Sequence, residues 1–381
     1  MKPFSVAFLL TFALGGISAH GATRIVTDSN AQSEINAAAN GDVIRFMPGT
    51  YPKITVVEKD LVFRHHGSVQ ANVFEIEANG SKLDLIDFKA AEVVANKTPN
   101  RSSRLRVVRG KYGRIISHAE NTVVAYSTLN YLKLFDSGTI TGNDFDGDTL
   151  FFSQVPVGGG IGIDINATSA QIMVNNNLIS DYKLNTNSPI DNECIGIQIN
   201  GSPSVDIVNN LIKNCTDHRD GPELTSCMGI YVSSAIDIRI LGNVLSNCGV
   251  QHGTNNGTPG NKLIWAPLGV VAQNNLFWKT NTHLTTSAGG GIIPVSTIIS
   301  DPKLNTDGSL ASDSPAINAG PPDPQYNDRD GTRNDIGMFG GHNFIPDGRT
   351  TDKPIVISLE VPIAVPAGGT VTIESTGATV K

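Results

Sequence analysis

The sequence is poor in charge, and basic residues are in the minority. Charged side chains make up 17% of the 381 residues, with 28 Lys and Arg against 35 Asp and Glu and a formal net charge of −7. Neutralising a phosphate backbone requires a basic surface, so this balance argues against nucleic-acid binding. Beyond the N-terminus, no stretch comes close to the 18 apolar residues of a membrane-spanning helix. We therefore expect no membrane span and no nucleic-acid partner.

The N-terminus has the three-part layout of a secretory signal peptide. Lys2 precedes an apolar run at residues 4–14, and small residues follow. This run is too short to span a bilayer, so export is favoured over a membrane anchor. We expect residues 1–22 to be removed, with cleavage between Ala19 and Ala22, and a secreted, periplasmic or cell-surface location.

The sequence is rich in Gly and contains a regular repeat. Its 39 glycines and low charge suit an all-β protein with many corners. One Asn recurs in front of apolar residues at intervals of 34, 33, 33 and 32 residues. The members of this series are Asn143, Asn177, Asn210, Asn243 and Asn275. Such a steady interval is typical of a repeat architecture.

Each repeat contains two β segments, because IGIDI, IGIQI and MGIYV recur upstream of the Asn at the same interval. Alternation with period two and many Ile, Val and Asn residues disfavour helical repeats. The leucine-rich repeat is an alternative for IRILGNVL, but it is usually 20 to 29 residues long and has one strand. We therefore predict a parallel β-helix, a solenoid of stacked turns.

Stacking gives the repeated Asn a structural role. Each turn of such a solenoid lies about 4.8 Å above the previous one, so equivalent residues are vertical neighbours. An Asn at an inward corner can hydrogen-bond the Asn above and below it, and can satisfy backbone groups that the bend removes from the sheet. We predict that Asn177, Asn210 and Asn243 form a column.

The four cysteines follow the same interval. Cys194 should lie under Cys227 and Cys215 under Cys248, within the Cα separation that a disulfide tolerates. Two disulfides are therefore predicted in an oxidising compartment. The alternative pairing, Cys215 with Cys227, would leave two free thiols. A zinc site is disfavoured because no pair has C-x-x-C spacing.

The segment AQSEINAAANGDVIRFMPGTY, residues 31–51, resembles the N-terminal cap and first strand of secreted right-handed parallel β-helix proteins. These form the pectate-lyase-like superfamily, which includes chondroitinase and alginate lyases. The segment contains a short amphipathic helix, an Asn-Gly turn and a strand, which suit a plug over one end of the core. The resemblance implies an all-β, right-handed, single-stranded parallel β-helix with an N-terminal capping helix.

The C-terminal region completes the expected domain organisation. Residues 301–341 look like the closing segment of many exported β-helix proteins, so the β-helix domain is expected at 23–345. Within it, DRDGTRND does not fit the frame of a calcium-binding loop and is interpreted as a polar capping turn. Residues 346–381 alternate like strands, broken by Pro and Gly, and are expected to form a β stub or linker.

Long loops follow the Asn corners and should project from one side, where sites usually lie. The loop TDHRDGPELTS contains Asp217, His218, Arg219, Asp220 and Glu223, which we take as the candidate catalytic residues. Lyase cleavage of a uronic-acid chain requires a base and a group that neutralises the carboxylate, roles that suit His218 or Arg219. Asp191, Asp217 and Asp220 are the candidate ligands for a Ca²⁺ ion that bridges the substrate carboxylate. Paired Asp residues would equally support hydrolysis, and a solvated charged turn is the alternative reading.

A second candidate lies in RSSRLRVVRGKYGR. If Leu105 and Val107 face inward, Arg104 and Arg106 point outward together. The predicted substrate-binding strip comprises Arg104, Arg106, Arg109 and Lys111. On an acidic protein such a strip suits a polyanionic glycan, while an exposed strand with scattered charges is the alternative.

No lyase or epimerase signature of the superfamily matches cleanly, so no catalytic residue is transferred by resemblance. The fold, the expected export and the basic strip predict an exported carbohydrate-active protein. The favoured activity is that of a polysaccharide lyase-like enzyme on an acidic polysaccharide. We expect the protein to be a monomer. Ca²⁺ is the one cofactor considered. The alternative is a non-catalytic extracellular protein that binds glycan or has a structural role.

Overall fold

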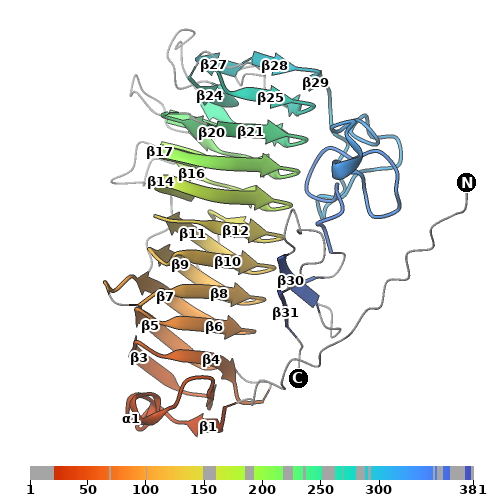
Figure 1. Ribbon diagram of the computed structural model, residues 1–381. Coiled ribbons are helices and arrows are strands. Elements are labelled where there is room, and N and C mark those ends of the chain that lie inside the picture. Colours follow the sequence, from red (N-terminus) through yellow and green to blue (C-terminus); the bar gives the residue numbers. More distant parts are fainter. Residues whose placement is uncertain are drawn as a thin grey trace, which may run out of the picture.

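Most of the chain forms a tall stack of β-coils in the computed structural model (Figure 1). The structure describes residues 21–67, 70–99, 101–148, 160–184, 193–217, 226–234, 237–250, 262–267, 269–279, 288–290, 293–345, 348–349, 355–360 and 374–378. Residues 1–20 of the expected signal peptide lie outside this set. No helix within these ranges has the length and apolarity needed to cross a membrane.

Each turn passes through three faces, and every strand of the stack pairs in parallel with its equivalent one turn on. Face B leads into the Asn corner. It contains β1 Thr23–Val26, β2 Val43–Phe46, β4 Asp60–His65, β6 Lys82–Ile86, β8 Arg104–Val108, β10 Asn121–Ala125, β12 Gly138–Thr141, β21 Asp237–Leu241, β25 Val271–Gln273, β28 Ile293–Val295 and the C-terminal halves of β14 Gly160–Asn175 and β17 Glu193–Val208.

Face C follows the corner, and face A closes the turn. In the N-terminal turns one long strand serves both faces: β3 Thr50–Val57, β5 Asn72–Asn79, β7 Lys89–Asn96, β9 Lys111–Ser117 and β11 Thr128–Leu134. In later turns face C contains β13 Asp144–Asp146, β15 Leu178–Ser180, β18 Leu211–Lys213, β22 Val244–Ser246, β26 Leu276–Trp278 and β29 Ile298–Ile299. Face A contains the N-terminal halves of β14 and β17, then β20 Ser226–Val232, β24 Ile264–Ala266 and β27 Ala288–Gly290.

The turns differ in length because of what lies between faces C and A. Successive corner residues are 16 to 22 residues apart up to Gly142 and 32 to 34 apart from there to Asn274. The additional residues of the longer turns lie between faces C and A, where a small parallel sheet joins adjacent turns. Its strands are β16 Lys183–Leu184, β19 Thr216–Asp217 and β23 Gly249–Val250. The stack is therefore regular on face B and variable on the opposite edge.

The corner between faces B and C depends on one residue with positive φ. Asn176, Asn209 and Asn274 have φ of 57°, 54° and 52°, and Gly142 and Gly242 occupy the same place in other turns. Gly adopts this conformation freely and Asn tolerates it better than most residues, which explains why these two types recur there. The bend is thus encoded one residue before the repeated Asn.

The predicted Asn column is confirmed. The Oδ1 of each of Asn177, Asn210 and Asn243 accepts hydrogen bonds from both the backbone N–H and the side-chain Nδ2 of the Asn one turn earlier, at 2.9–3.0 Å. Each of the three Nδ2 groups also donates to a face B carbonyl of the preceding turn. All are fully buried. The column satisfies backbone groups that the bend leaves without sheet partners.

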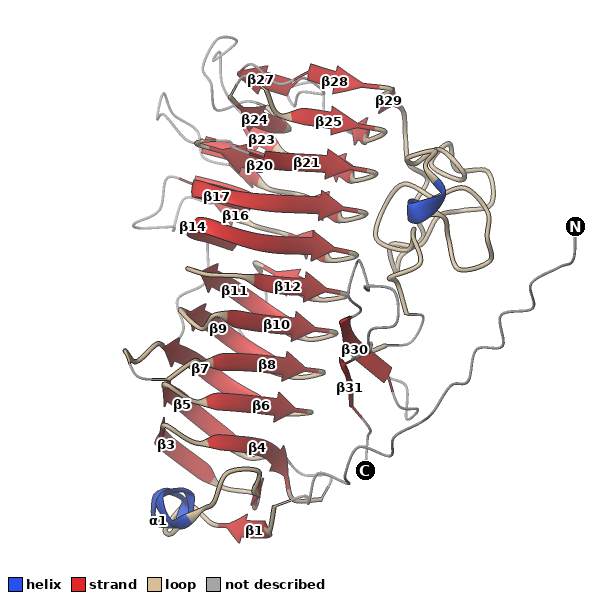
Figure 2. Cartoon of the chain, viewed as in Figure 1, coloured by secondary structure: helices blue, strands red, loops and turns tan. Residues whose placement is uncertain are grey.

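The core is a set of stacked inward columns. Ile140, Val174, Ile207 and Ile240 lie in register on consecutive turns and are all fully buried. The helix α1 Ala31–Ala37 lies at the N-terminal end of the stack (Figure 2). Its residues Ala31 and Ile35 are buried in the core. An all-β stack of mostly parallel strands agrees with the sequence analysis, while its right-handedness and the capping role of α1 stay predictions.

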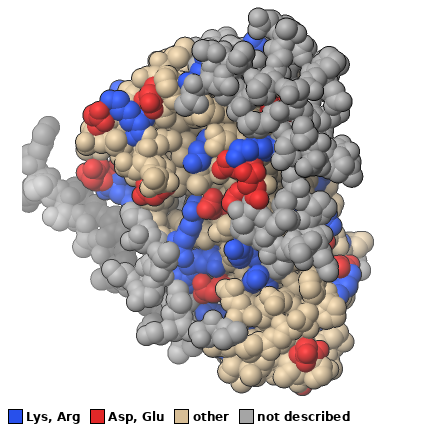
Figure 3. All heavy atoms as spheres, turned by 180° about the vertical axis from the view of Figure 1, so that it is seen from behind, with Lys and Arg blue, Asp and Glu red and all other residues tan. Residues whose placement is uncertain are grey.

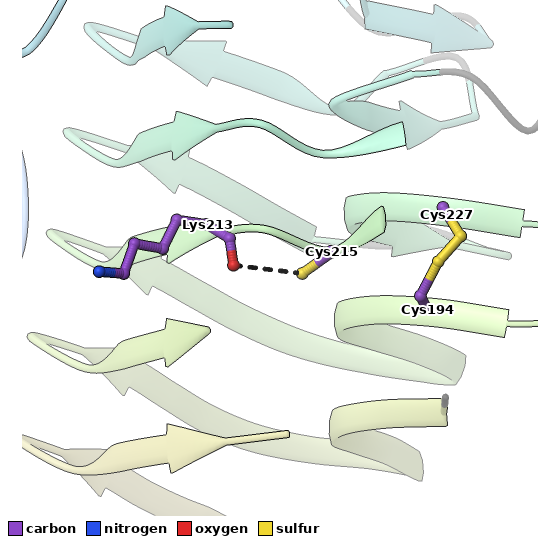
Figure 4. Close-up of a disulfide and its surroundings, with 4 residues drawn as sticks. All are labelled: Cys194, Lys213, Cys215 and Cys227. Carbon is purple, nitrogen blue, oxygen red and sulfur yellow. Dashed lines mark hydrogen bonds between the residues drawn. A yellow bond between two sulfur atoms is a disulfide. The ribbon is translucent and has the colours of Figure 1, made fainter. Parts of the chain in front are cut away.

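One of the two predicted disulfides is present. Cys194 and Cys227 are paired in register and joined, with Cα atoms 4.4 Å apart (Figure 4). The prediction of a Cys215–Cys248 disulfide is wrong in this structure, because both thiols are free and buried. Each thiol instead lies near the carbonyl oxygen two residues earlier in its own chain segment, 4.0 Å for Cys215 and 3.5 Å for Cys248.

The C-terminal segment, residues 301–345, folds back along the flank of the stack instead of covering its end (Figure 1). It contains the 3-10 helix η1 Pro324–Tyr326. Its apolar residues Ala316, Ile336 and Met338 pack on the outer side of face C, against Leu211 and Val244. We call it the flank segment. Further on, β30 Ile355–Glu360 and β31 Glu374–Ala378 pair antiparallel.

Candidate functional site

Most of the predicted catalytic loop lies outside the described residues, namely His218, Arg219, Asp220 and Glu223, as does Asp191. Asp217 is described, and it is a strand residue of β19 that is only 3% exposed. It pairs in register with Leu184 and Val250 of the small sheet. Within the described ranges, no three His, Cys, Asp or Glu side chains are grouped so as to hold a metal ion.

The predicted basic strip points outward as expected, but its charges are partly matched. Leu105 and Val107 are fully buried, while Arg104 and Arg106 lie on the outer side of face B. Asp84, one turn earlier, lies 3.0 Å from Arg104 and 4.0 Å from Arg106. The strip is therefore an ion-pair cluster and not a continuous cationic surface.

The other two residues of the strip differ from each other. Arg109 occupies a corner with φ of 53°, and its side chain is only 2% exposed. Its Nη2 donates to Asp87 at 3.3 Å. Burial raises the pKa of the Asp87 carboxyl, and Arg109 and Arg64 act against that shift. Lys111 begins β9 just after the corner and is exposed. Arg109 is therefore largely buried against Asp87, and a role for it in substrate binding stays a prediction.

Face A contains an outward column that the sequence analysis missed. Lys133, Asp164, Gln198, Tyr231 and Trp265 lie in register on five consecutive turns. Their strand neighbours on both sides are buried aliphatic residues or Ala, so these five side chains share the outer surface. The signal was present in IGIDI, IGIQI and MGIYV, whose fourth residue is the outward one.

Asp164 is the centre of a polar cluster at the N-terminal part of this column. Its Oδ2 lies 2.8 Å from Lys133 Nζ and accepts from the Tyr131 hydroxyl at 3.1 Å. The carboxylate side chain is 6% exposed, and its Oδ1 has no partner among the described residues. Arg114, one turn before Tyr131, pairs with Glu92 at 2.7 Å. A lysine, a hydroxyl and a buried carboxylate thus converge at Asp164, beside the Arg114–Glu92 pair.

Aromatic rings occupy the other part of the column. Tyr231 and Trp265 stack with centroids 5.3 Å apart and planes 22° apart, and both are half-buried. Next to the polar cluster, Lys133 Nζ lies 5.3 Å from the centroid of Phe135, which stacks on His118. Burial lowers the pKa of His118, and the nearby Lys97 and Lys133 contribute. A flat aromatic surface and a charged cluster are thus aligned along the axis of the stack.

On the face opposite to that of Figure 1, charges of both signs lie close together among the described residues. Seen from behind, Figure 3 shows acidic and basic side chains gathered together over the middle of the molecule, beside parts of the chain that are not described. Such mixing disfavours general attraction of any polyanion and favours recognition by local groups.

These features define an all-β protein of stacked parallel coils with a polar and aromatic outer column. No family model matches the chain, and no curated protein matches it. Among solved structures it is similar to the crystal structure of pectate lyase Pel9A, with 13% sequence identity and a TM-score of 0.45. The match covers 83% of this chain and 96% of that chain.

Proposed function

We propose that the protein is carbohydrate-active and that face A binds an acidic polysaccharide laid along the axis of the stack. The observation that carries this proposal is the register of Lys133, Asp164, Gln198, Tyr231 and Trp265 on consecutive turns. Because turns are about 4.8 Å apart, the column offers a linear ligand an evenly spaced row of polar and aromatic contacts.

The polar cluster also supports lyase chemistry. In a β-elimination a base removes the proton beside the uronate carboxylate, a carbon–carbon double bond forms, and the bond to the glycosidic oxygen breaks. In this proposal the Asp164 carboxylate is the base, which requires its Oδ1, buried in this structure, to be uncovered when the substrate binds. Lys133 neutralises the substrate carboxylate, and Tyr131 donates a proton to the departing oxygen. Atoms and charge balance without a metal or other co-reactant.

The second candidate is glycan binding without cleavage. It is favoured by the low exposure of Asp164, which Lys133 and Tyr131 hold as in a structural ion pair. Because both candidates share face A, they predict the same binding and differ only in turnover.

The test combines a turnover assay with a binding assay. Purified protein is incubated with alginate, polygalacturonate or chondroitin sulfate, with and without Ca²⁺, while the absorbance of the unsaturated product is followed. Asp164→Asn should abolish turnover, and Trp265→Ala should weaken binding at least about tenfold. Asp237→Asn is the matched control, since it makes the same change on the outside of face B and should alter neither.

The outcomes separate the candidates. Saturable binding that Trp265→Ala weakens, without product from any substrate, would establish the second candidate over the first. Absence of both binding and product across the three polymers would reject face A as a site for acidic polysaccharides.

A further inference from the structure

A cavity of about 310 Å³ lies between face B and the flank segment, away from face A. Its floor comes from outward residues of β14, β17 and β21, and its wall from the flank segment. Met173, Asn175, Asp206 and Arg239 line it from the stack, and Tyr326 lines it from the flank segment. Its size is at the lower end of the range for small-molecule sites.

Among the described residues that line this cavity, Asn175 has a buried acceptor without a partner. Asn175 is 3% exposed, and its Oδ1 has no hydrogen bond among the described residues. Its orientation is fixed by the network, because Asn176 Nδ2 donates to the carbonyls of Met338 and Gly340 at 3.0 and 2.7 Å. The Oδ1 of Asn176 must therefore accept, and Asn175 Nδ2 donates to it at 2.9 Å. This Oδ1 is closed to solvent in the structure, so a ligand donor reaches it only by displacing the groups that cover it.

The charges at this site cancel each other. Arg239 Nε donates to Asp206 Oδ1 at 2.6 Å, and a second bond joins Arg239 Nη2 to Asp206 Oδ2. A bidentate pair of this kind leaves no net charge to attract an anion. Its outer edges still offer donors and acceptors, so the site favours a neutral ligand with hydrogen-bonding groups of both kinds.

Apolar surface accompanies these polar groups. Met173 is 39% exposed on the floor of the cavity, next to Val208, and Tyr326 contributes a ring from the flank segment. The amides of Gln325 and Asn343 also line it. A sugar ring combines these requirements, because its C–H face packs on apolar groups while its hydroxyls both donate and accept.

We propose that this cavity binds a single neutral sugar unit, with one hydroxyl donating to Asn175 Oδ1 and others meeting the Asp206–Arg239 pair. The site is separate from face A and belongs to the junction between the stack and the flank segment. It would give the protein a second carbohydrate contact with a different charge preference.

Titration calorimetry with free monosaccharides tests the proposal. The probes are glucose, galactose, mannose and xylose, with glucuronate and galacturonate as acidic counterparts. At least one neutral sugar should bind with a Kd of about 1 mM or tighter. Met173→Trp, which fills the cavity from an exposed position, should weaken binding at least about tenfold, and Asn175→Leu should do the same by removing the acceptor.

The matched control is Val271→Trp. Val271 occupies the same outward column of face B two turns beyond Asp206, is 37% exposed and lies outside the cavity lining, so this variant should bind like the wild type. Asp164→Asn should also bind monosaccharides normally, which separates this site from face A. The proposal is overturned if no neutral sugar binds, if binding survives Met173→Trp, or if the uronates bind more tightly at a site that this variant blocks.

Discussion

Asn209 and Asn334 exchange a reciprocal pair of side-chain hydrogen bonds, 3.0 and 3.1 Å long, across 125 residues of sequence. Asn334 is fully buried and also donates to the carbonyl of Tyr326 at 2.6 Å. Asn209 is a corner residue, so this pair joins the flank segment to the bend of the stack. Two neighbouring corners also bind the flank segment: Asn274 Nδ2 donates to the carbonyl of Ala319, and Asn176 Nδ2 donates to the carbonyl of Met338.

Asn334→Ala should release the flank segment. The change leaves buried polar groups of Asn209 and Tyr326 without partners, at about 1–3 kcal/mol for each. Limited proteolysis should cleave within residues 301–345 much faster than in the wild type, while circular dichroism of the stack persists. Asn305→Ala, at an exposed position of the same segment, should not increase cleavage. Equal cleavage rates for the two variants would contradict the bracing role of Asn334.

Asn210→Ala should strongly destabilise the stack. Asn210 accepts from the backbone and side chain of Asn177, donates to the carbonyl of Val174, and is fully buried. Because several buried groups lose partners at once, we expect a loss of about 3–5 kcal/mol in the free energy of unfolding. Urea denaturation measures this. The exposed Asn166→Ala should cost less than about 0.5 kcal/mol, and a similar effect of both variants would remove the special role of the column.

Stability should fall in mild acid because of His65. Burial, aided by Lys89, lowers its pKa from 6.5 to about 4, its Nδ1 accepts from the Ala71 N–H, and the ring stacks on Phe88. The folded state then binds fewer protons than the unfolded state between these pH values. The contribution of neutral His65 to the free energy of unfolding is present above pH 6.5. It is lost as the pH falls towards 4, by on the order of 3 kcal/mol.

His65→Asn tests this pH dependence, because Asn keeps an acceptor near the Nδ1 position and does not titrate. Urea midpoints measured from pH 7.5 to pH 4.5 should decline less steeply for the variant than for the wild type. Parallel declines would assign the acid sensitivity to other groups.

The Cys194–Cys227 disulfide closes a loop with a sequence separation of 33 residues. From the loop entropy of the unfolded chain, replacing both cysteines by Ser should cost about 3–4 kcal/mol. Urea denaturation of the double variant, compared with the wild type, measures it. A change below about 1 kcal/mol would show that stacking alone fixes this edge of the turn.

The two remaining cysteines should be unreactive until the protein unfolds. Cys215 and Cys248 are fully buried, and contact with the Cys248 thiol together with burial raises the pKa of the Cys215 thiol well above its usual value. Since the thiolate is the reactive form, a thiol reagent should label no cysteine in the native chain and two after denaturation. Zero labelled thiols after denaturation would instead indicate a second disulfide.

Features tied to the repeat interval were predictable from the sequence. A fixed interval makes Asn177 and Asn210 vertical neighbours, and the same reasoning placed Cys194 under Cys227. The same interval predicted the second disulfide, but Cys215 and Cys248 stay free although their thiols are in contact, because register brings two cysteines together without joining them. The 33-residue interval does not apply to the short N-terminal turns. There Asp84 pairs with Arg106 only 22 residues later, so the sequence analysis overlooked the carboxylate that faces this arginine.

Contacts outside the repeat were not predictable. The sequence around Asn334 does not indicate that this residue contacts Asn209. The flank segment has no repeat, so no regular spacing relates its residues to those of the stack. On face A, Asp164 and Gln198 stand at readable positions, but Lys133 and Trp265 come from turns of irregular sequence. The column is therefore apparent only from the strand register of the structure.

The flank segment changes how the coils can come apart. A solenoid whose turns touch only their neighbours loses order stepwise from either end. Here Asn274 donates to the carbonyl of Ala319 and Asn176 donates to the carbonyl of Met338, so the flank segment spans the turns between these two corners. We therefore expect those turns to unfold cooperatively. The turns at the end that carries α1 have no such brace from the flank segment, so we expect them to lose order before the braced turns.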